Sequence, residues 1–204
     1  MVRKNGWLTI VGKGLIVAFL FIEIYPIFWI MMSSVKSNNE FALSPSYALP
    51  QGLYWQNYVE AWNRGRMNIY FMNSAIVTVI SLVLIVILST TSAFALTKMR
   101  WRFRGRVMSM FLSGIMVPTA VVLIPLYMIY NNIGLINSRL SLILTYIAFG
   151  LPLSIFLLRS YLVALPDELM EASVIDGANI YQVFYHVVLP LMKTGIVTVG
   201  VIQF

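Results

Sequence analysis

Residues 166–178, Pro-Asp-Glu-Leu-Met-Glu-Ala-Ser-Val-Ile-Asp-Gly-Ala, form a polar island in a chain that is otherwise strongly apolar. Four of the seven acidic residues of the whole chain lie in this stretch, namely Asp167, Glu168, Glu171 and Asp176. Pro166 suits the first turn of a helix, where carboxylates also interact favourably with the helix dipole. Gly177 suits the left-handed position that follows a last helical turn. The stretch therefore predicts a short helix with sharp ends, placed in water between two apolar spans.

Long apolar runs flank this island on both sides. Of all residues, 60% are hydrophobic and only 10% are charged. A bilayer core of about 30 Å is crossed by roughly 20 apolar residues in a helix, and lipid offers the backbone no other hydrogen-bond partners. We therefore predict an all-α fold, a polytopic membrane helical bundle that forms a single domain over residues 1–204. The predicted membrane helices cover residues 8–32, 71–97, 107–130 and 140–163, with part of a fifth at 189–204.

The net charge of +7 is concentrated in one loop. Between the second and third spans, with no acidic residue among them, stand Lys98, Arg100, Arg102, Arg104 and Arg106. Short basic loops stay on the cytoplasmic side of a membrane. By the same rule, Arg3, Lys4 and Lys13 predict a cytoplasmic N-terminus. The fourth span would then end on the cytoplasmic side, so that the acidic helix lies in the cytoplasm. A role of the basic loop in contacting lipid head groups or a partner is the alternative, and nucleic acid is not an expected partner.

The acidic segment resembles the EAA loop of ABC importer permeases, whose pattern is E-A-A-x3-G-x9-I-x-L-P. The matching positions are Glu171, Ala172, Ser173, Asp176, Gly177, Ala178, Val187, Leu189 and Pro190. Two of them depart conservatively, since Ser173 stands where alanine is usual and Val187 where isoleucine is usual. The order Asp-Gly-Ala at 176–178 resembles the form common in sugar importers. The alternative is an interfacial helix with a glycine stop, which many membrane proteins contain.

Weaker matches to the carbohydrate branch of this family, similar to the maltose and glycerol-3-phosphate permeases, are spread along the chain. They are Pro26-Ile-Phe-Trp29, Ser34, Lys36, Asn57-Tyr58, Asn73-Ser74, Met116-Val-Pro118, Ile124-Pro-Leu-Tyr127 and Gly134-Leu135. The resemblance thus covers nearly the whole chain and implies the type I importer permease fold. Such permeases usually have six membrane helices, whereas about two-thirds of a span follows Pro190. We therefore expect the chain to be incomplete at its C-terminus.

The resemblance implies the permease subunit of an ATP-driven importer in a bacterial or archaeal inner membrane, with a cytoplasmic N-terminus. Its implied partners are a second permease subunit, a cytoplasmic ATPase dimer, an extracytoplasmic solute-binding protein and membrane lipid. The chain has no phosphate-binding G-x-x-x-x-G-K-[ST] loop, so the partner would bind ATP. Accordingly we expect no cofactor and no catalytic residue in this chain. Sugars, oligosaccharides, polyols and glycerol phosphates stay open as solutes, and a non-sugar solute is the alternative.

In this interpretation, segment 166–190 couples the permease to the ATPase. The interface residues are Glu171, Ala172, Ser173, Asp176, Gly177, Ala178, Leu189 and Pro190. Glu171 would offer charge-assisted hydrogen bonds to the partner, Ala172 and Ser173 would permit close approach, and Gly177 would set the angle at which the chain leaves.

Other polar or helix-breaking residues inside the spans suggest further roles. Glu23 is the only acidic residue well inside a predicted span. It could contact the solute or pair with a neighbouring polar group, and the chain could alternatively be an ion-coupled carrier or channel that uses Glu23. Pro118 and Pro125 predict kinks in the third span, suited either to gating or to packing. The hydroxyl cluster 89–92 favours close helix packing. No metal site is expected, since the chain has no cysteine and His186 is its single histidine.

One stretch outside the spans, residues 55–62, has aromatic residues on one side of a predicted helix. It would lie along the membrane interface, with contact to a protein that delivers solute as the alternative. A purely structural membrane subunit, with the acidic helix as a passive contact, is a further alternative for the whole chain.

Overall fold

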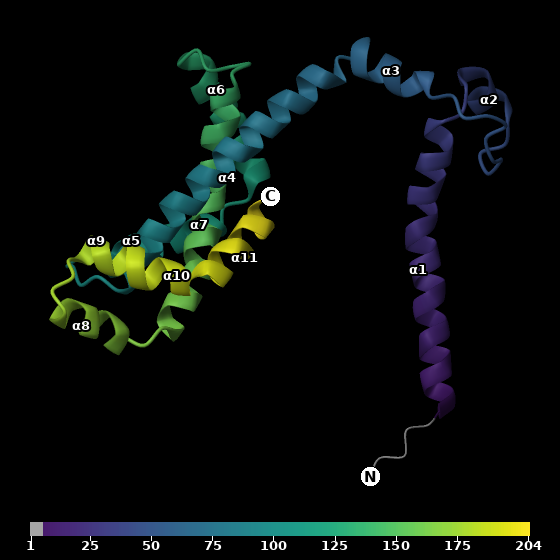
Figure 1. Ribbon diagram of the computed structural model, residues 1–204. Helices are drawn as coiled ribbons and strands as arrows, with labels where there is room; N and C mark the ends of the chain where they lie inside the picture. The colour runs from purple at the N-terminus through teal and green to yellow at the C-terminus, as the bar shows by residue number, and fades with distance from the viewer. Residues whose placement is uncertain (1–5) are drawn as a thin grey trace. The chain divides into compact units, whose positions relative to one another are not determined.

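The computed structural model describes residues 6–204, and over this range the chain forms helices and no strand (Figure 1). Three helices are long and apolar enough to cross a membrane, namely α1 (Gly6–Ser34), α4 (Met67–Thr97) and α7 (Arg139–Ala164). Two bent helix pairs raise the number to as many as five. The prediction of an all-α, multi-pass membrane protein is thereby confirmed. Arg3 and Lys4, which supported the predicted orientation of the N-terminus, lie outside the described residues.

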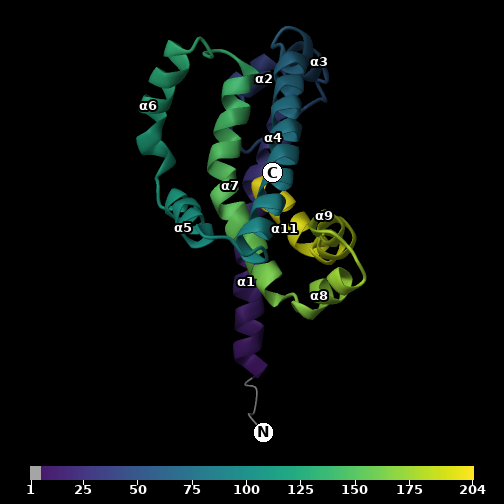
Figure 2. The same ribbon diagram turned by 90° about the vertical axis from the view of Figure 1, so that its left-hand side faces the viewer.

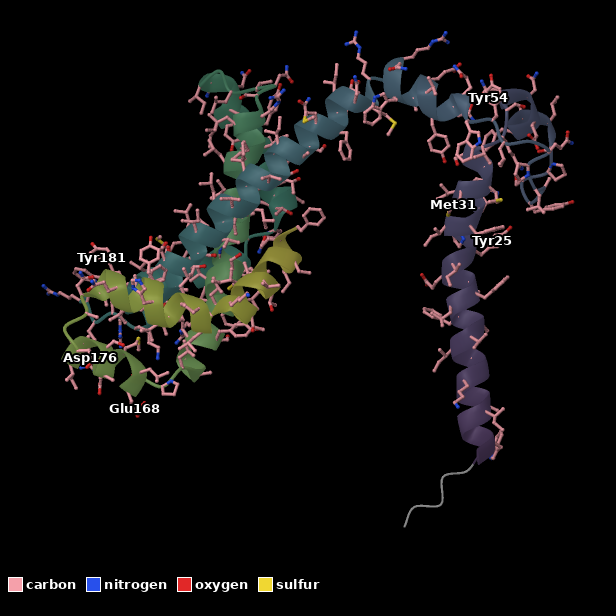
Figure 3. All side chains as sticks on the ribbon, in the orientation of Figure 1. Tyr25, Met31, Tyr54, Glu168, Asp176 and Tyr181 are labelled. Atoms are coloured by element: carbon pink, nitrogen blue, oxygen red, sulfur yellow. The ribbon has the colours of Figure 1, made fainter. Side chains whose placement is uncertain are left out.

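The chain divides into two compact units, of which the first ends at Tyr70 and contains α1, α2 (Asn38–Leu43) and α3 (Gln56–Asn63). A hydrogen-bonded corner ties α3 to the end of α1. The Ser34 Oγ lies 2.6 Å from the Tyr58 hydroxyl, and the Asn57 amide donates to the carbonyls of Ser34 and Lys36 at 2.9 and 2.7 Å. These four residues belong to the weaker family matches, so the corner gives them a shared structural role. Tyr54 lies at the same corner (Figure 3).

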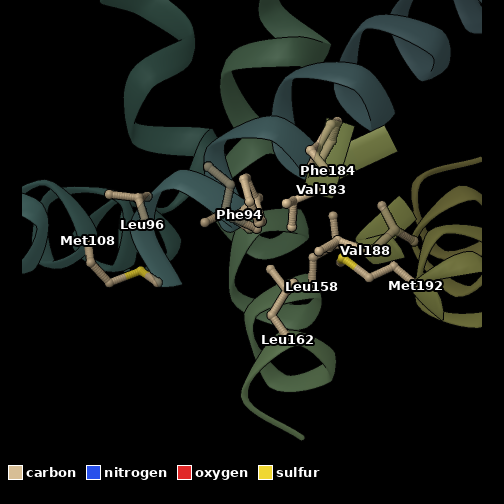
Figure 4. Packing of buried hydrophobic residues seen from close by; sticks show 12 residues of the cluster. Phe94, Leu96, Met108, Leu158, Leu162, Val183, Phe184, Val188 and Met192 are labelled. Carbon is tan, nitrogen blue, oxygen red and sulfur yellow. The ribbon is translucent and has the colours of Figure 1, made fainter. Parts of the chain in front are cut away.

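The second unit, Phe71–Phe204, is built around α4 and α7. Buried side chains of α4 and α7 meet those of the C-terminal helices in one apolar cluster (Figure 4). Leu158 and Leu162 of α7 are fully buried, one turn apart, and they face Val188 and Met192 across the cluster. In α4, Ser89 and Thr90 are also buried, which agrees with the packing role that small hydroxyl residues have in membrane helices.

The third predicted span is two helices rather than one kinked helix. Helix α5 (Arg104–Ile115) and helix α6 (Thr119–Asn132) are inclined by 101°, and in Figure 2 α6 turns from the end of α5 to run lengthwise alongside α7. Pro118 stands in the extended conformation just before α6, where it offers no N–H and keeps the preceding residue from continuing α5. Pro125 lies inside α6. The expected kink at Pro118 is therefore a complete break, while Pro125 is accommodated within a continuous helix.

The C-terminal helical path starts earlier than the predicted fifth span. It comprises α9 (Ile180–Val183), the π-helical turn η1 (Phe184–Val188) and α10 (Leu189–Leu191), then bends by 71° into α11 (Lys193–Gln203). In η1 the Leu189 N–H donates to the carbonyl of Phe184, five residues back. Pro190 has no N–H to donate, so an ordinary α-helical ladder is interrupted at this point.

Candidate functional site

The acidic segment forms helix α8 (Glu168–Ile175), and its end has the geometry predicted for Gly177. Gly177 has a φ of +90°, in the left-handed region. Its N–H donates to the carbonyl of Val174, and the N–H of Ala178 donates to the carbonyl of Ser173, both at 3.0 Å. These two bonds are the Schellman arrangement, which satisfies carbonyls that a helix end leaves free. Helix α8 therefore ends sharply at the glycine.

The next helix begins at once. Asn179 accepts a hydrogen bond from the Gln182 N–H at 3.0 Å, and the Gln182 side chain accepts one from the Asn179 N–H at 2.8 Å. This reciprocal capping box fixes the start of α9. The sequence contains the signal for this box, an asparagine followed three residues later by a glutamine, although it was not among the predicted features. Two capped helix ends thus hold the connection between α8 and α9.

The start of α8 differs in detail from the prediction. Asp167 is the N-cap residue, so Pro166 precedes the helix instead of standing in its first turn. Leu165 is extended, as expected of a residue before proline. Glu168 and Glu171 occupy the first turn of α8, where the helix dipole favours their charge.

The predicted interface residues fall into two groups. Glu171, Ala172, Asp176 and Gly177 are exposed, whereas Ser173 is half-buried and its hydroxyl donates to the Leu169 carbonyl of its own helix. Exposed apolar side chains accompany them: Ile175 is 85% exposed and Tyr181 is 74% exposed. Figure 3 shows Glu168, Asp176 and Tyr181 pointing away from the rest of the second unit. In the other group, Ala178 and Leu189 pack against the apolar cluster, next to the exposed Pro190.

Lys98 holds the connection between α7 and α8. Its ammonium group lies 2.5 Å from Asp167 Oδ1 and donates to the Leu165 carbonyl at 2.7 Å. The Lys98 side chain is only 8% exposed, whereas that of Asp167 is 67% exposed. The hydrogen bond and charge of Lys98 lower the pKa of the Asp167 carboxyl below its ordinary value, and the charge of Arg100 adds to this. From the sequence alone, Lys98 is expected to be one of several solvated basic residues, and no local pattern predicts this contact.

A pocket of about 440 Å³ opens beside this ion pair. It is lined by the end of α4, by α8 and by α9, with Lys98, Arg100, Asp167 and Glu171 among its polar residues and Phe94, Met170, Val174 and Ile180 among its apolar ones. Charged and apolar groups therefore alternate around one concave surface next to the exposed face of α8. This arrangement suits contact with a protein surface better than binding of a small apolar molecule.

A second pocket, of about 390 Å³, lies between α4, α7 and α11. Its lining residues are Thr78, Ser81, Leu82, Ile85, Tyr146, Phe149, Gly150, Gln203 and Phe204. The Gln203 amide donates to the Gly150 carbonyl at 3.3 Å, and the buried Ser81 hydroxyl has no partner within the described structure. Hydroxyl, amide and aromatic groups therefore meet within apolar helices. No local sequence pattern marks these residues, which are far apart along the chain.

The remaining candidates have simple surroundings. Glu23 is exposed on α1, and the ion pairs within residues 6–204 are Lys98–Asp167 and the surface pair Arg64–Glu60. His186 is exposed, and its Nδ1 lies 3.1 Å from the carbonyl of Gln182 on the preceding helical turn.

The chain is similar to known proteins over almost its whole length. The family model described as "Binding-protein-dependent transport system inner membrane component" matches residues 85–204, which include the whole pocket beside Lys98 and the α7 and α11 walls of the other pocket. The diacetylchitobiose uptake system permease protein NgcG of Streptomyces coelicolor is 36% identical over 95% of this chain. The probable ABC transporter permease protein YurM of Bacillus subtilis is 35% identical over 94% of it, and the inner membrane ABC transporter permease protein YcjP of Escherichia coli is 33% identical over 91%. The chain spans 64%, 65% and 67% of the length of these three relatives.

Proposed function

The chain belongs to the family of binding-protein-dependent transport system inner membrane components, and from this premise we propose that it is the permease subunit of an ATP-driven importer for a sugar or sugar-like solute. The observation that carries the proposal is helix α8, which presents exposed carboxylates between two sharply defined ends. The name of the Streptomyces relative, a diacetylchitobiose uptake permease, supports a carbohydrate as the solute.

Helix α8 would be the contact through which an ATPase drives the permease. Its exposed acids can accept charge-assisted hydrogen bonds, and the exposed Ile175 and Tyr181 add apolar area for a partner to cover. The Schellman end and the capping box leave little freedom at the α8–α9 connection. A push on α8 would therefore be passed to α7 and to the C-terminal helices instead of being absorbed in a loose loop.

The solute pathway would include the pocket between α4, α7 and α11. A sugar offers many hydroxyl groups and weakly polar ring faces, which match side-chain hydroxyls, an amide and aromatic rings. The unpartnered Ser81 hydroxyl is a group that a passing solute could satisfy. We also propose the partners of such an importer: a second permease subunit, an ATPase dimer and an extracytoplasmic solute-binding protein. In this arrangement the N-terminus and the basic loop at 98–106 face the cytoplasm.

The test is reconstitution of the full-length permease with its partner subunits in proteoliposomes. Uptake of labelled diacetylchitobiose and of simple sugars is measured with ATP inside the vesicles, and separately with an imposed proton or sodium gradient and no ATP. ATP-dependent uptake of a carbohydrate is expected. Uptake driven by the ion gradient alone would instead support the ion-coupled alternative based on Glu23, and ATP-dependent uptake of another solute class would correct the proposed substrate.

A further inference from the structure

The connection between α7 and α8 is held by a side chain from a distant part of the chain. Lys98 follows the last residue of α4, and its backbone N–H continues that helix by donating to the Phe94 carbonyl at 2.9 Å. From there its ammonium group reaches Leu165 and Asp167, which are 67 and 69 residues away in sequence. A single side chain therefore joins the end of α4, the end of α7 and the start of α8.

Both partners of Lys98 are groups that a helix end leaves available. Leu165 is the C-cap residue of α7, where carbonyls lack helical partners and the helix dipole favours a cation. Asp167 is the N-cap residue of α8, yet its side chain makes no capping hydrogen bond to that helix. Its carboxylate is directed to Lys98 instead, at 2.5 Å. An ammonium group that is mostly buried requires such partners, because an uncompensated buried charge is strongly unfavourable.

The other basic residues of the same loop do not share this environment. Arg100, Arg102, Arg104 and Arg106 are exposed. Arg102 and Arg106 lie over the Phe103 ring, at 5.4 and 5.5 Å from its centroid. Topology needs positive charge on the loop, and exposed arginines supply it. Burial of Lys98 against the α7–α8 connection is therefore not explained by topology alone.

Two of the elements that Lys98 joins, α4 and α7, are also walls of the second pocket, the one between α4, α7 and α11, which we call the polar pocket. Helix α7 contributes Tyr146 and Gly150 to this pocket and is covalently continuous with α8 through Leu165–Asp167. Helix α4 contributes Thr78 and Ser81, and its direct hydrogen-bonded link to the start of α8 is the Lys98 side chain. Movement of α8 can thus reach one wall through the backbone and the other through this ion pair.

We propose that Lys98 is a positioning residue that makes the end of α4 move together with the start of α8, so that both walls of the polar pocket respond to the ATPase. The inference rests on the proposed function of α8 as the ATPase contact. Without the pair, α8 would still bind the ATPase through its exposed face, but α4 would follow it less closely, through apolar packing alone. ATP hydrolysis and solute movement would then become partly uncoupled.

The experiment uses the full-length permease in its reconstituted transporter, and it compares Lys98→Met, Asp167→Asn, the double variant and Lys98→Arg. Lys98→Met keeps the apolar stem of the side chain and removes only the charge and the donors. Arg102→Met is the matched control, because it removes a positive charge from the same loop at an exposed position. For each variant, co-purification of the ATPase, ATP hydrolysis, the KM for solute and the solute transported per ATP are measured.

We expect Lys98→Met to bind the ATPase and hydrolyse ATP while the solute transported per ATP falls about tenfold, within the usual range of coupling between linked sites. The KM should stay near that of the wild type, because Lys98 does not line the polar pocket. Asp167→Asn should lose less, since the bond to the Leu165 carbonyl remains. The double variant should be no worse than Lys98→Met, Lys98→Arg should recover most of the coupling, and Arg102→Met should behave as the wild type.

The inference is overturned by a normal ratio of solute to ATP in Lys98→Met, or by losses of the two single variants that multiply in the double variant. If Lys98→Met does not assemble, Asp167→Asn decides, and normal coupling in Asp167→Asn then overturns the proposal. Failure of the proposed function is a different result. In that case the wild-type transporter itself shows no ATP-driven uptake.

Discussion

Phe94 of α4 and Phe184 of η1 pack ring against ring, with centroids 5.0 Å apart and planes inclined by 45°. Both side chains are buried, and Phe184 also meets Tyr185 edge-on at 5.2 Å. Phe94 lies one helical turn before Lys98, so apolar packing and an ion pair together hold the end of α4 against the segments that flank α8. The candidate coupling site therefore rests on packed side chains, not on loop backbone alone.

Replacing either ring should loosen this region. Phe94→Ala and Phe184→Ala are each expected to destabilise the permease by about 3 kcal/mol or more, because each removes a large buried side chain. The double variant should lose about 0.5–1.5 kcal/mol less than the sum, which is the interaction of the two rings. Thermal unfolding of the purified transporter measures these differences. Phe103→Ala is the control, since Phe103 is 45% exposed; additive losses for the pair would contradict a direct ring contact.

A side chain at Gly177 should disturb the end of α8 without a steric clash in the chain itself. A Cβ there meets no atom within 4 Å, but the φ of +90° strains any other residue by roughly 1–2 kcal/mol. We expect Gly177→Val to leave membrane insertion intact, weaken co-purification of the ATPase and abolish uptake. Glu171→Ala should act in the same direction more mildly. Gly105→Ala is the control, because Gly105 lies in a helix and also has open space. Normal ATPase association and normal uptake in Gly177→Val would show that α8 is not the coupling element.

The Lys98–Asp167 pair also predicts a pH dependence. The pKa of the Asp167 carboxyl is lowered by Lys98, so the pair stabilises the fold above the unfolded value of about 3.9. This contribution is lost as the pH falls through the lowered folded pKa. The difference in unfolding temperature between the wild type and Asp167→Asn should therefore be constant from about pH 5 to pH 8 and shrink only in stronger acid. A difference that changes between pH 5 and pH 8 would show that another group controls it.

The unpartnered hydroxyl of Ser81 separates a solute-binding role from a structural one. Ser81→Ala should leave the unfolding temperature nearly unchanged, because no hydrogen bond within the described structure is lost. The KM for solute should rise several-fold if the hydroxyl contacts the solute. Thr90→Val is the control, since the Thr90 hydroxyl is likewise buried without a partner but does not line the polar pocket. An equal effect of both variants on the KM would argue against this pocket as part of the pathway.

The orientation of the chain is tested through the basic loop. Five positive charges without an acid among them should resist translocation, so the loop is expected in the cytoplasm. The chain has no cysteine, and a cysteine at Arg102 is therefore a unique label site. A membrane-impermeant thiol reagent should modify it only after the membrane is opened. Modification in intact cells would reverse the proposed topology.

Features set by neighbouring residues were predictable from the sequence. The lengths of α1, α4 and α7 follow from long, mainly apolar runs, and the end of α8 follows from Gly177, whose left-handed conformation was confirmed. The break before Pro118 was only half predicted, as a kink. How far a helix bends at a proline depends on whether surrounding helices hold its two halves in line, and no local pattern records this.

Features set by contacts between distant residues were missed. Lys98 looks like one of five similar basic residues, and only the approach of α7 and α8 to the end of α4 makes it a buried partner of Asp167. The polar pocket was missed for the same reason. Ser81, Tyr146 and Gln203 are separate polar residues in separate apolar helices, and helix packing alone brings them together.

The π-helical turn η1 makes the alignment of this chain sensitive to a single residue. A π turn closes its hydrogen bond over one more residue than an α turn. Deleting one residue between 184 and 188 would let the segment continue as an ordinary α-helix with every later side chain kept in place, whereas the same change without the deletion would turn every later side chain by about 100° around the helix axis. Gln203 would then leave the polar pocket, although the hydropathy profile would hardly change. Comparisons of relatives across this segment should therefore allow a one-residue gap inside η1, because an ungapped alignment would match pocket-lining residues to lipid-facing ones.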